Sequence, residues 1–292
     1  MTGQHRFKPY AIAVILALHA SALTAQQIDP PPGPAPPLSS AAGNEPFELR
    51  ISPRRFLGDE YRIWTSPFRP RSYTSRTMKR YVVPFLLLTG GLIASDRKTA
   101  ELLPNTPAQV KWSGRVSQMG ASYTMAGFSA ATYLVGKSIG NAHASKTGLL
   151  GLEAFAHTQI VVQGLKLMTR RERPLMNDQE GRFWKGGTSF PSGHAASAFA
   201  IATVFAYEYR DHLAIPIAAY SAAGIIAASR TSARRHFVGD VVVGASLGFL
   251  IGRFVYRNHR DPNFPGSPAQ PTSRLTPEVG FGSGGVTLNW SF

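Results

Sequence analysis

The chain has 292 residues, which suits one large domain with arms or two small domains. Its 31 Lys and Arg residues against 16 Asp and Glu give a formal net charge of +15, which favours an anionic partner such as a phosphate ester, a membrane surface or nucleic acid. The absence of cysteine excludes disulfide scaffolds, thiolate metal sites and cysteine nucleophiles, while a hydrophobic fraction of 43% argues against global disorder.

The first 25 residues have the pattern of an export signal. Arg6 and Lys8 precede an uninterrupted apolar run over residues 11–18, and residues 20–25 offer small-residue cleavage sites. An uncleaved anchor helix is the alternative, but the apolar run is shorter than the roughly 20 residues that a membrane span needs. We therefore predict a signal peptide over residues 1–25.

Residues 26–80 are predicted to form a proline-rich linker followed by a basic arm. Six of the eight residues at 30–37 are proline, which favours a stiff, extended chain. Residues 62–80 carry six Lys and Arg residues and no acidic residue. This arm either contacts anionic lipid head groups or is a solvated segment packed loosely on the body.

Residues 81–260 are predicted to form an all-α domain, a bundle of six helices. The six apolar stretches are rich in Ala and Leu, and charges or clusters of Pro, Gly and Asn separate them. They lie near residues 82–95, 120–136, 148–168, 195–207, 213–229 and 237–252.

The C-terminal residues 261–292 are predicted to be a proline-rich tail with a short β-hairpin. Residues 261–278 contain five prolines. Apolar and polar residues then alternate from Val286 to Phe292, as on a strand, and residues 282–285 could turn this strand back against Val279 and Phe281.

Two short segments of the helical domain combine cations with an anion-binding helix start. Lys166 and Arg173 are seven residues apart, so a helix would place them on one face, and Pro174 should end that helix at Arg173. Pro191-Ser192-Gly193-His194 precedes an apolar helix. Ser192 suits its N-cap, and free backbone N–H groups at the helix start can bind an anion.

A third segment, from Ser229 to Asp240, contains Arg230 and His236. His236 and Asp240 are four positions apart, so on a helix the carboxylate would hold the imidazole in one tautomer. Together the segments supply three cations, a helix N-terminus and two histidines, as a site for a dianionic phosphate requires.

In order and spacing, the three segments resemble the signature of the type 2 phosphatidic acid phosphatase (PAP2) and vanadium haloperoxidase superfamily. The pattern is Lys-x6-Arg-Pro, then Pro-Ser-Gly-His, then Ser-Arg-x5-His-x3-Asp. Sixteen residues separate Pro174 from Pro191, and thirty-four separate His194 from Ser229. The resemblance covers residues 81–257, and with the signal sequence it identifies a bacterial exported member.

The resemblance implies a role for each matching residue. Lys166, Arg173 and Arg230 would bind the phosphate oxygens, with Ser192 and the Gly193 N–H completing the cradle. His236 would be the nucleophile that forms a phosphohistidine, and Asp240 would orient it. His194 would protonate the leaving oxygen and then activate water. No metal or other cofactor is implied, and no carboxylate cluster in the sequence suggests one.

The sequence departs from the family pattern just before His236. Many relatives have a glycine and a small residue there, whereas this chain has Arg234 and Arg235. The two arginines either add positive charge at the mouth of the pocket or point to solvent.

The implied activity is hydrolysis of phosphomonoesters by an acid or lipid phosphatase. The basic arm favours lipid phosphates such as phosphatidic acid or isoprenyl (pyro)phosphates over small esters. A vanadate-dependent haloperoxidase, with vanadate bound at His236, is one alternative, and a non-catalytic envelope-binding protein is another. In a phosphatase, vanadate could occupy the phosphate site as an inhibitor. No nucleic-acid-binding module is recognisable.

The predicted location is the cell envelope, facing the periplasm. After signal cleavage, six membrane spans would place all three motifs on the cytoplasmic side. The mean hydropathy of −0.08 is low for a chain made of spans. The third apolar stretch also contains Glu153, His157, Gln159 and Gln163, which are costly in lipid. We therefore expect peripheral or partial membrane association.

Overall fold

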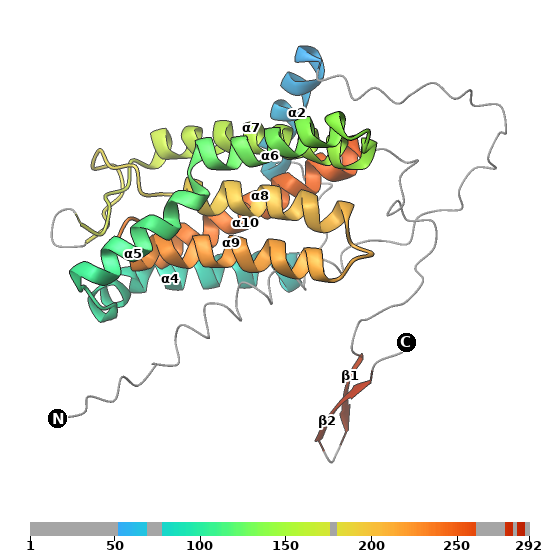
Figure 1. Cartoon of the computed structure of the whole chain (residues 1–292). Helices are drawn as coiled ribbons and strands as arrows, with labels where there is room; N and C mark the ends of the chain where they lie inside the picture. The colour runs from blue at the N-terminus through green and yellow to red at the C-terminus, as the bar shows by residue number, and fades with distance from the viewer. Residues whose placement is uncertain (1–51, 69–77, 176–179, 261–277, 283–284, 290–292) are drawn as a thin grey trace, which may run out of the picture. The chain divides into compact units, whose positions relative to one another are not determined.

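A computed structural model describes residues 52–68, 78–175, 180–260, 278–282 and 285–289 (Figure 1). The predicted signal peptide over residues 1–25 and the linker at 30–37 lie outside the described residues, as do residues 69–77 of the basic arm. The chain divides after Arg260 into two compact units. The described residues form eight α-helices and one β-hairpin, so the predicted all-α fold with a C-terminal hairpin is confirmed.

Each of the six predicted apolar stretches corresponds to a long helix. These helices are α4 (Val83–Leu102), α6 (Ser122–Ser138), α7 (Ala142–Thr169), α8 (Gly193–Glu208), α9 (Ala214–Ser232) and α10 (Val238–His259).

Two further helices, α2 (Pro53–Thr65) and α5 (Pro107–Ser117), were not among the predicted elements. Both have proline in the first turn, where the missing N–H costs no hydrogen bond. In α5 the side chain of Thr106 also caps the backbone N–H of Gln109. Short single turns at Ser66–Phe68, Met78–Val82 and Gln118–Gly120 adjoin α2, α4 and α6.

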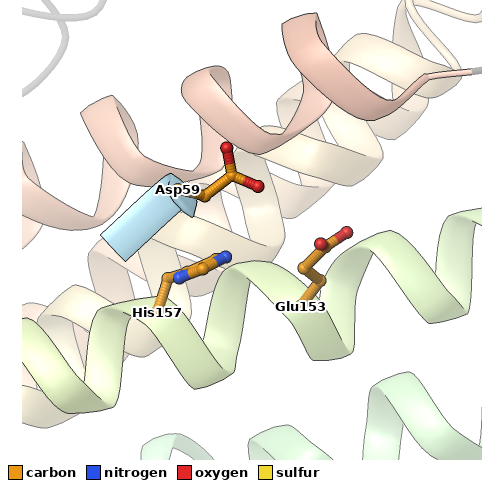
Figure 2. A group of neighbouring side chains, drawn as sticks. All are labelled: Asp59, Glu153 and His157. Atoms are coloured by element: carbon orange, nitrogen blue, oxygen red, sulfur yellow. The ribbon is translucent and has the colours of Figure 1, made fainter. Parts of the chain in front are cut away.

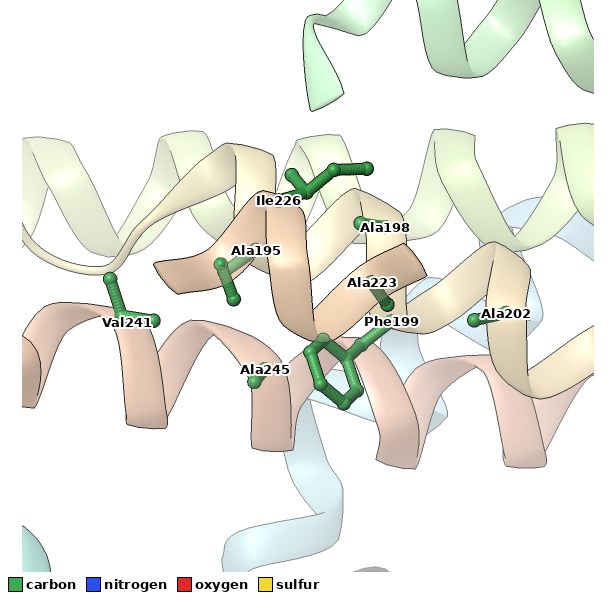
Figure 3. Packing of buried hydrophobic residues seen from close by; sticks show 9 residues of the cluster. Ala195, Ala198, Phe199, Ala202, Ala223, Ile226, Val241 and Ala245 are labelled. Atoms are coloured by element: carbon green, nitrogen blue, oxygen red, sulfur yellow. The ribbon is translucent and has the colours of Figure 1, made fainter. Parts of the chain in front are cut away.

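Helix α8 is the centre of the bundle and packs against α7, α9 and α10 (Figure 1). Its sequence is apolar all round, as expected for a helix surrounded by others. Ala195, Ala198 and Phe199 of α8 meet Ile226 of α9 and Val241 of α10 in the main apolar cluster (Figure 3).

Three glycines of α10 allow its close approach to α8. Gly244, Gly248 and Gly252 recur every four residues and therefore share one face of the helix. A Cβ atom at Gly248 would lie 2.0 Å from the carbonyl oxygen of Ala196, and one at Gly252 would lie 2.4 Å from that of Ala200. Backbone contact between α8 and α10 fixes the start of each helix, where the motif residues lie.

Helix α10 is the one helix among the described residues that is long and apolar enough to cross a membrane. In its most apolar 18-residue stretch, 67% is buried inside the structure. The buried core helix of a soluble protein passes the same test.

The second unit contains the predicted hairpin. Strand β1 (Glu278–Gly282) pairs antiparallel with β2 (Gly285–Asn289), and the register sets Val279 opposite Leu288 and Phe281 opposite Val286.

Candidate active site

The first motif spans the end of α7 and the loop that follows. Lys166 lies in the last turn of α7, which ends at Thr169. Arg170 then takes a left-handed conformation with φ of 44° and closes the helix. The expected single helix from Lys166 to Arg173 is therefore wrong, because Arg173 follows three residues beyond this break. The loop returns Arg173, half-buried, toward the same site.

The second motif forms the start of α8. Ser192 occupies the N-cap position and is fully buried, but its hydroxyl makes no cap hydrogen bond and has no hydrogen-bond partner among the described residues. The expected capping bond is thus absent, and the Oγ is left for a ligand. A Cβ atom at Gly193 would lie 4.0 Å from Nζ of Lys166, so the ammonium group of Lys166 faces the N-terminus of α8.

The third motif spans the end of α9 and the start of α10. Arg230 lies in the last turn of α9 and donates a hydrogen bond to Oγ of Ser117. His236 precedes α10, whose N-cap is Phe237, and Asp240 is the third residue of the helix. The expectation that a helix stacks His236 on Asp240 is therefore wrong.

The hydrogen bond that orients His236 comes from the backbone. Nδ1 of His236 lies 2.7 Å from the carbonyl oxygen of Ser189 and 3.7 Å from Oδ2 of Asp240. A carbonyl oxygen only accepts hydrogen bonds, so Nδ1 carries the proton and Nε2 keeps its lone pair. The group that fixes the tautomer is the Ser189 carbonyl rather than the predicted Asp240.

Asp240 instead organises the buried polar network behind His236. Its carboxylate accepts hydrogen bonds from Arg171 at 2.7 Å, from Ser189 Oγ at 2.5 Å and from the backbone N–H of Phe237 at 3.0 Å. Arg171 also lies 2.9 Å from Asp96 of α4. The guanidinium group is held between the rings of Phe183 and Phe237.

Sequence reasoning missed Arg171, Asp96 and Ser189 as parts of this site. Asp96 accepts a hydrogen bond from the backbone N–H of Gly239, so it ties α4 to the start of α10. No short-range pattern marks these residues, because Asp96 is 75 residues from Arg171 in the sequence and 144 residues from Asp240.

The motif cations are close enough to perturb one another. Burial, followed by the charges of Arg173 and Arg230, lowers the pKa of Lys166 to about 8. Burial and the neighbouring arginines Arg173 and Arg235 lower the pKa of Arg230 to about 10. A pocket that lowers the pKa of several cationic side chains in this way strongly favours binding of an anion.

Both motif histidines are neutral at pH 7 in this environment. Burial, together with the charges of Arg230, His236 and Lys166, lowers the pKa of His194 to about 3. Burial lowers the pKa of His236 to about 4, although Asp240 partly offsets the effect. Burial acts to raise the pKa of Asp240, but its interactions with His236 and Arg171 together lower it, so the carboxylate stays ionised.

The two arginines before His236 have different environments. Arg234 is buried, has a positive φ of 53° and donates a hydrogen bond to the carbonyl oxygen of Leu103 at 2.7 Å. It therefore does not point to solvent, and it lines a small cavity together with His236. Arg235 is exposed and lies close enough to lower the pKa of Arg173 and of Arg230.

Two solved structures match the chain at low similarity. LpxE of Aquifex aeolicus is 22% identical with a TM-score of 0.43, and the match covers 59% of this chain and 94% of that one. A PAP2 type phosphatidylglycerolphosphate phosphatase from Bacillus subtilis is 24% identical with a TM-score of 0.47, over 60% and 94% of the two chains.

Two curated relatives align with parts of the chain. Lipid A 1-phosphatase of Porphyromonas gingivalis is 41% identical over 80 residues, which are 26% of this chain and 18% of that protein. Phosphatidylglycerophosphatase B of Bacillus subtilis is 36% identical over 112 residues, 36% of this chain and 54% of the relative. The alignments thus leave a large share of each relative unmatched. Residues 148–264 match the PAP2 superfamily and contain all three motifs, so the resemblance of this part of the chain to that superfamily is confirmed.

Proposed function

We propose that the chain is a phosphatase that hydrolyses lipid phosphomonoesters through a phosphohistidine intermediate. The observation that carries the proposal is the convergence of Lys166, Arg173 and Arg230 on the N-terminus of α8, next to two neutral histidines. Each cation depresses the pKa of His194, so all three act on the same small volume. A phosphate dianion bound there would be held by charge and by the unpartnered Ser192 hydroxyl.

His236 is the proposed nucleophile. Its neutral Nε2 attacks phosphorus, an N–P bond forms, and the bond to the ester oxygen breaks. The Ser189 carbonyl holds the proton on Nδ1 and so keeps the attacking lone pair on Nε2. The ionised Asp240 nearby stabilises the positive charge that His236 acquires.

His194 is the proposed acid and base. Bound phosphate would neutralise the cations that hold its pKa near 3, and the pKa would then rise toward the range in which imidazole exchanges protons at neutral pH. His194 protonates the leaving oxygen in the first step. In the second step it takes a proton from water, which attacks phosphorus and breaks the N–P bond.

Exposed apolar side chains beside the site support a lipid substrate. Leu167 and Met168 adjoin Lys166, while Leu175 and Trp184 lie on the loop around Arg173, and each is at least 60% exposed. Phosphatases that act on lipid A and phosphatidylglycerophosphate are among the relatives. Phosphatidic acid and isoprenyl (pyro)phosphates are the candidate substrates, and the envelope facing the periplasm remains the proposed location.

The test is phosphate release by the full chain, with a water-soluble phosphomonoester and with phosphatidic acid in mixed micelles. His236→Ala should lower turnover of both substrates by at least about 10³-fold, whereas His212→Ala, at an exposed turn, should leave it unchanged. Trp184→Ala should raise KM for phosphatidic acid and leave KM for the water-soluble phosphomonoester unchanged. Equal release by the wild type and His236→Ala would contradict the proposal.

A further inference from the structure

A second buried polar cluster lies at the junction of α2, α7 and α10, away from the proposed active site. It comprises Arg55, Asp59 and Glu60 of α2, Glu153 and His157 of α7, and His259 of α10. His157 precedes Lys166 by nine residues, about 14 Å along the helix, and His259 is at the opposite end of α10 from Asp240. The proposed phosphatase reaction does not use this cluster.

Three of these side chains converge from two helices. Glu153 and His157 are four residues apart and share one face of α7, and Asp59 of α2 lies opposite them. One potential ligand atom from each of the three lies within 4.8 Å of the others. Figure 2 shows the imidazole of His157 extending toward the space between the two carboxylates.

The hydrogen bond on the other side of His157 fixes its tautomer. Nδ1 of His157 lies 2.7 Å from Oε1 of Glu60, and an ionised carboxylate only accepts, so Nδ1 carries the proton. The His157 side chain is 0% exposed, and within the part of the chain that the structure describes its Nε2 has no hydrogen-bond partner. A carboxylate bound to one imidazole nitrogen while the other faces a cation is the usual outer shell of a metal-binding histidine. Phe56 stacks on the ring at 4.1 Å and holds it in place.

The cluster carries more negative than permanent positive charge. Asp59, Glu60 and Glu153 are buried carboxylates. Arg55 lies 3.0 Å from Glu153, and the more exposed Arg62 lies 4.0 Å from Asp59. His259 adds ring nitrogens at 3.1 Å from Asp59 and 3.0 Å from Glu153. The three buried carboxylates and Arg55 together carry a net charge of −2 before the exposed Arg62 and the histidines are counted, and this excess of buried negative charge favours a cation.

We propose that Asp59, Glu153 and His157 bind a divalent metal ion, with His259 placed to supply a fourth ligand. Imidazole nitrogen together with carboxylate oxygen favours Zn²⁺ over Mg²⁺ or Ca²⁺. Because Asp59 belongs to α2 and the other ligands to α7 and α10, the ion would fasten α2 to the catalytic domain. Its role is structural.

The test uses the full chain after chelation and gel filtration, with Zn²⁺ as the probe. Elemental analysis should find one Zn²⁺ per chain, and saturating Zn²⁺ should raise Tm by about 5 °C or more. Glu153→Gln and His157→Gln should each lose the bound Zn²⁺ and the rise in Tm. The control is His143→Gln, also on α7, which removes the pair between His143 and Glu208 of α8. It should keep the bound Zn²⁺ and the rise in Tm.

A second measurement tests the proposal if the variants fail to fold, and it also distinguishes the proposed site from Zn²⁺ binding at the phosphate site. Co²⁺ added to the wild type and to His236→Ala should give the same visible absorption of a four-coordinate ion, and Zn²⁺ should abolish it. The proposal is overturned if the wild type binds no Zn²⁺, if His157→Gln binds as much as the wild type, or if the Co²⁺ band disappears in His236→Ala.

Discussion

At the scale of single residues, the proposed phosphate site trades stability for affinity. Lys166 has a folded pKa of about 8 against an ordinary value near 10.5, because burial and two arginines disfavour its charge. Between these two pH values the unfolded chain binds more protons, so stability should rise with pH there. Below pH 8 the folded protein carries the full cost of the buried charge.

This cost predicts opposite effects of Lys166→Met on stability and activity. At pH 7 the variant should be more stable by about 1–3 kcal/mol, measured by denaturant unfolding, since the buried cation is removed. Its kcat/KM should fall by about 10²-fold or more, because a ligand of the phosphate is lost. A decrease in both quantities would indicate a structural role for Lys166 instead.

The same pKa sets the alkaline limit of catalysis. For the wild type, kcat/KM should fall above about pH 8, as Lys166 loses the proton that makes it a phosphate ligand. Lys166→Arg keeps its charge at high pH and should move this limit upward. A pH profile in which the alkaline limb is the same for both proteins would contradict the assignment.

Arg171 is predicted to be essential for folding rather than for binding phosphate. It is 1% exposed and lies between Asp96 and Asp240, so Arg171→Met would leave two buried carboxylates uncompensated. We expect a loss of about 3–5 kcal/mol in the free energy of unfolding. Arg97→Met removes an exposed pair with Glu101 on α4 and should cost less than about 1 kcal/mol. Equal losses in the two variants would refute the buried-network interpretation.

The motifs predicted which residues meet at the site, but not how they are held. Lys166, His194 and Arg230 come together because their local sequences end or begin helices at one end of the bundle. The tautomer of His236 depends on a backbone carbonyl 47 residues away, and a carbonyl has no signature in the sequence.

At the scale of elements, apolar content decided what could be predicted. The six helices that surround or form the core contain long apolar runs, so their number and order were evident. Helix α2 escaped notice because it is strongly polar, and side-chain contacts such as Arg55–Glu153 link it to α7. The sequence marks its partners Glu153 and His157 only as polar residues that are costly in lipid. Their burial against α2 depends on tertiary structure and could not be predicted.

The contact between α8 and α10 gives a prediction for glycine substitutions. Gly248→Ala would bring a Cβ to 2.0 Å from the Ala196 carbonyl, so the helices must separate, at a cost of about 1–3 kcal/mol or more. A Cβ atom at Gly224 on α9 would meet no atom of the described residues within 4 Å, so Gly224→Ala should stabilise the protein by up to about 1 kcal/mol through helix propensity. Thermal unfolding of both variants measures the difference. The prediction is contradicted if Gly248→Ala is as stable as Gly224→Ala.

At the scale of the whole molecule, charge and exposed apolar surface together favour a membrane surface. The net charge of +15 attracts anionic head groups. Large apolar side chains are more than half exposed on several helices. Examples are Leu87 on α4, Leu134 on α6, Ile217 and Ile225 on α9, and Leu250 on α10. Salt screens the first contribution but not the second.

This difference predicts how vesicle binding by the full chain should respond to salt. At about 0.05 M salt, affinity for vesicles with anionic lipids should exceed that for zwitterionic vesicles by about 10-fold or more, as only a few basic residues need to contact the surface. At about 0.5 M salt the two affinities should converge on a common value above zero, which the apolar side chains supply. Co-sedimentation measures both. Complete release by salt would show that membrane association is purely electrostatic. Equal affinities at low salt would show that the excess positive charge does not bind the membrane and acts at the phosphate site alone.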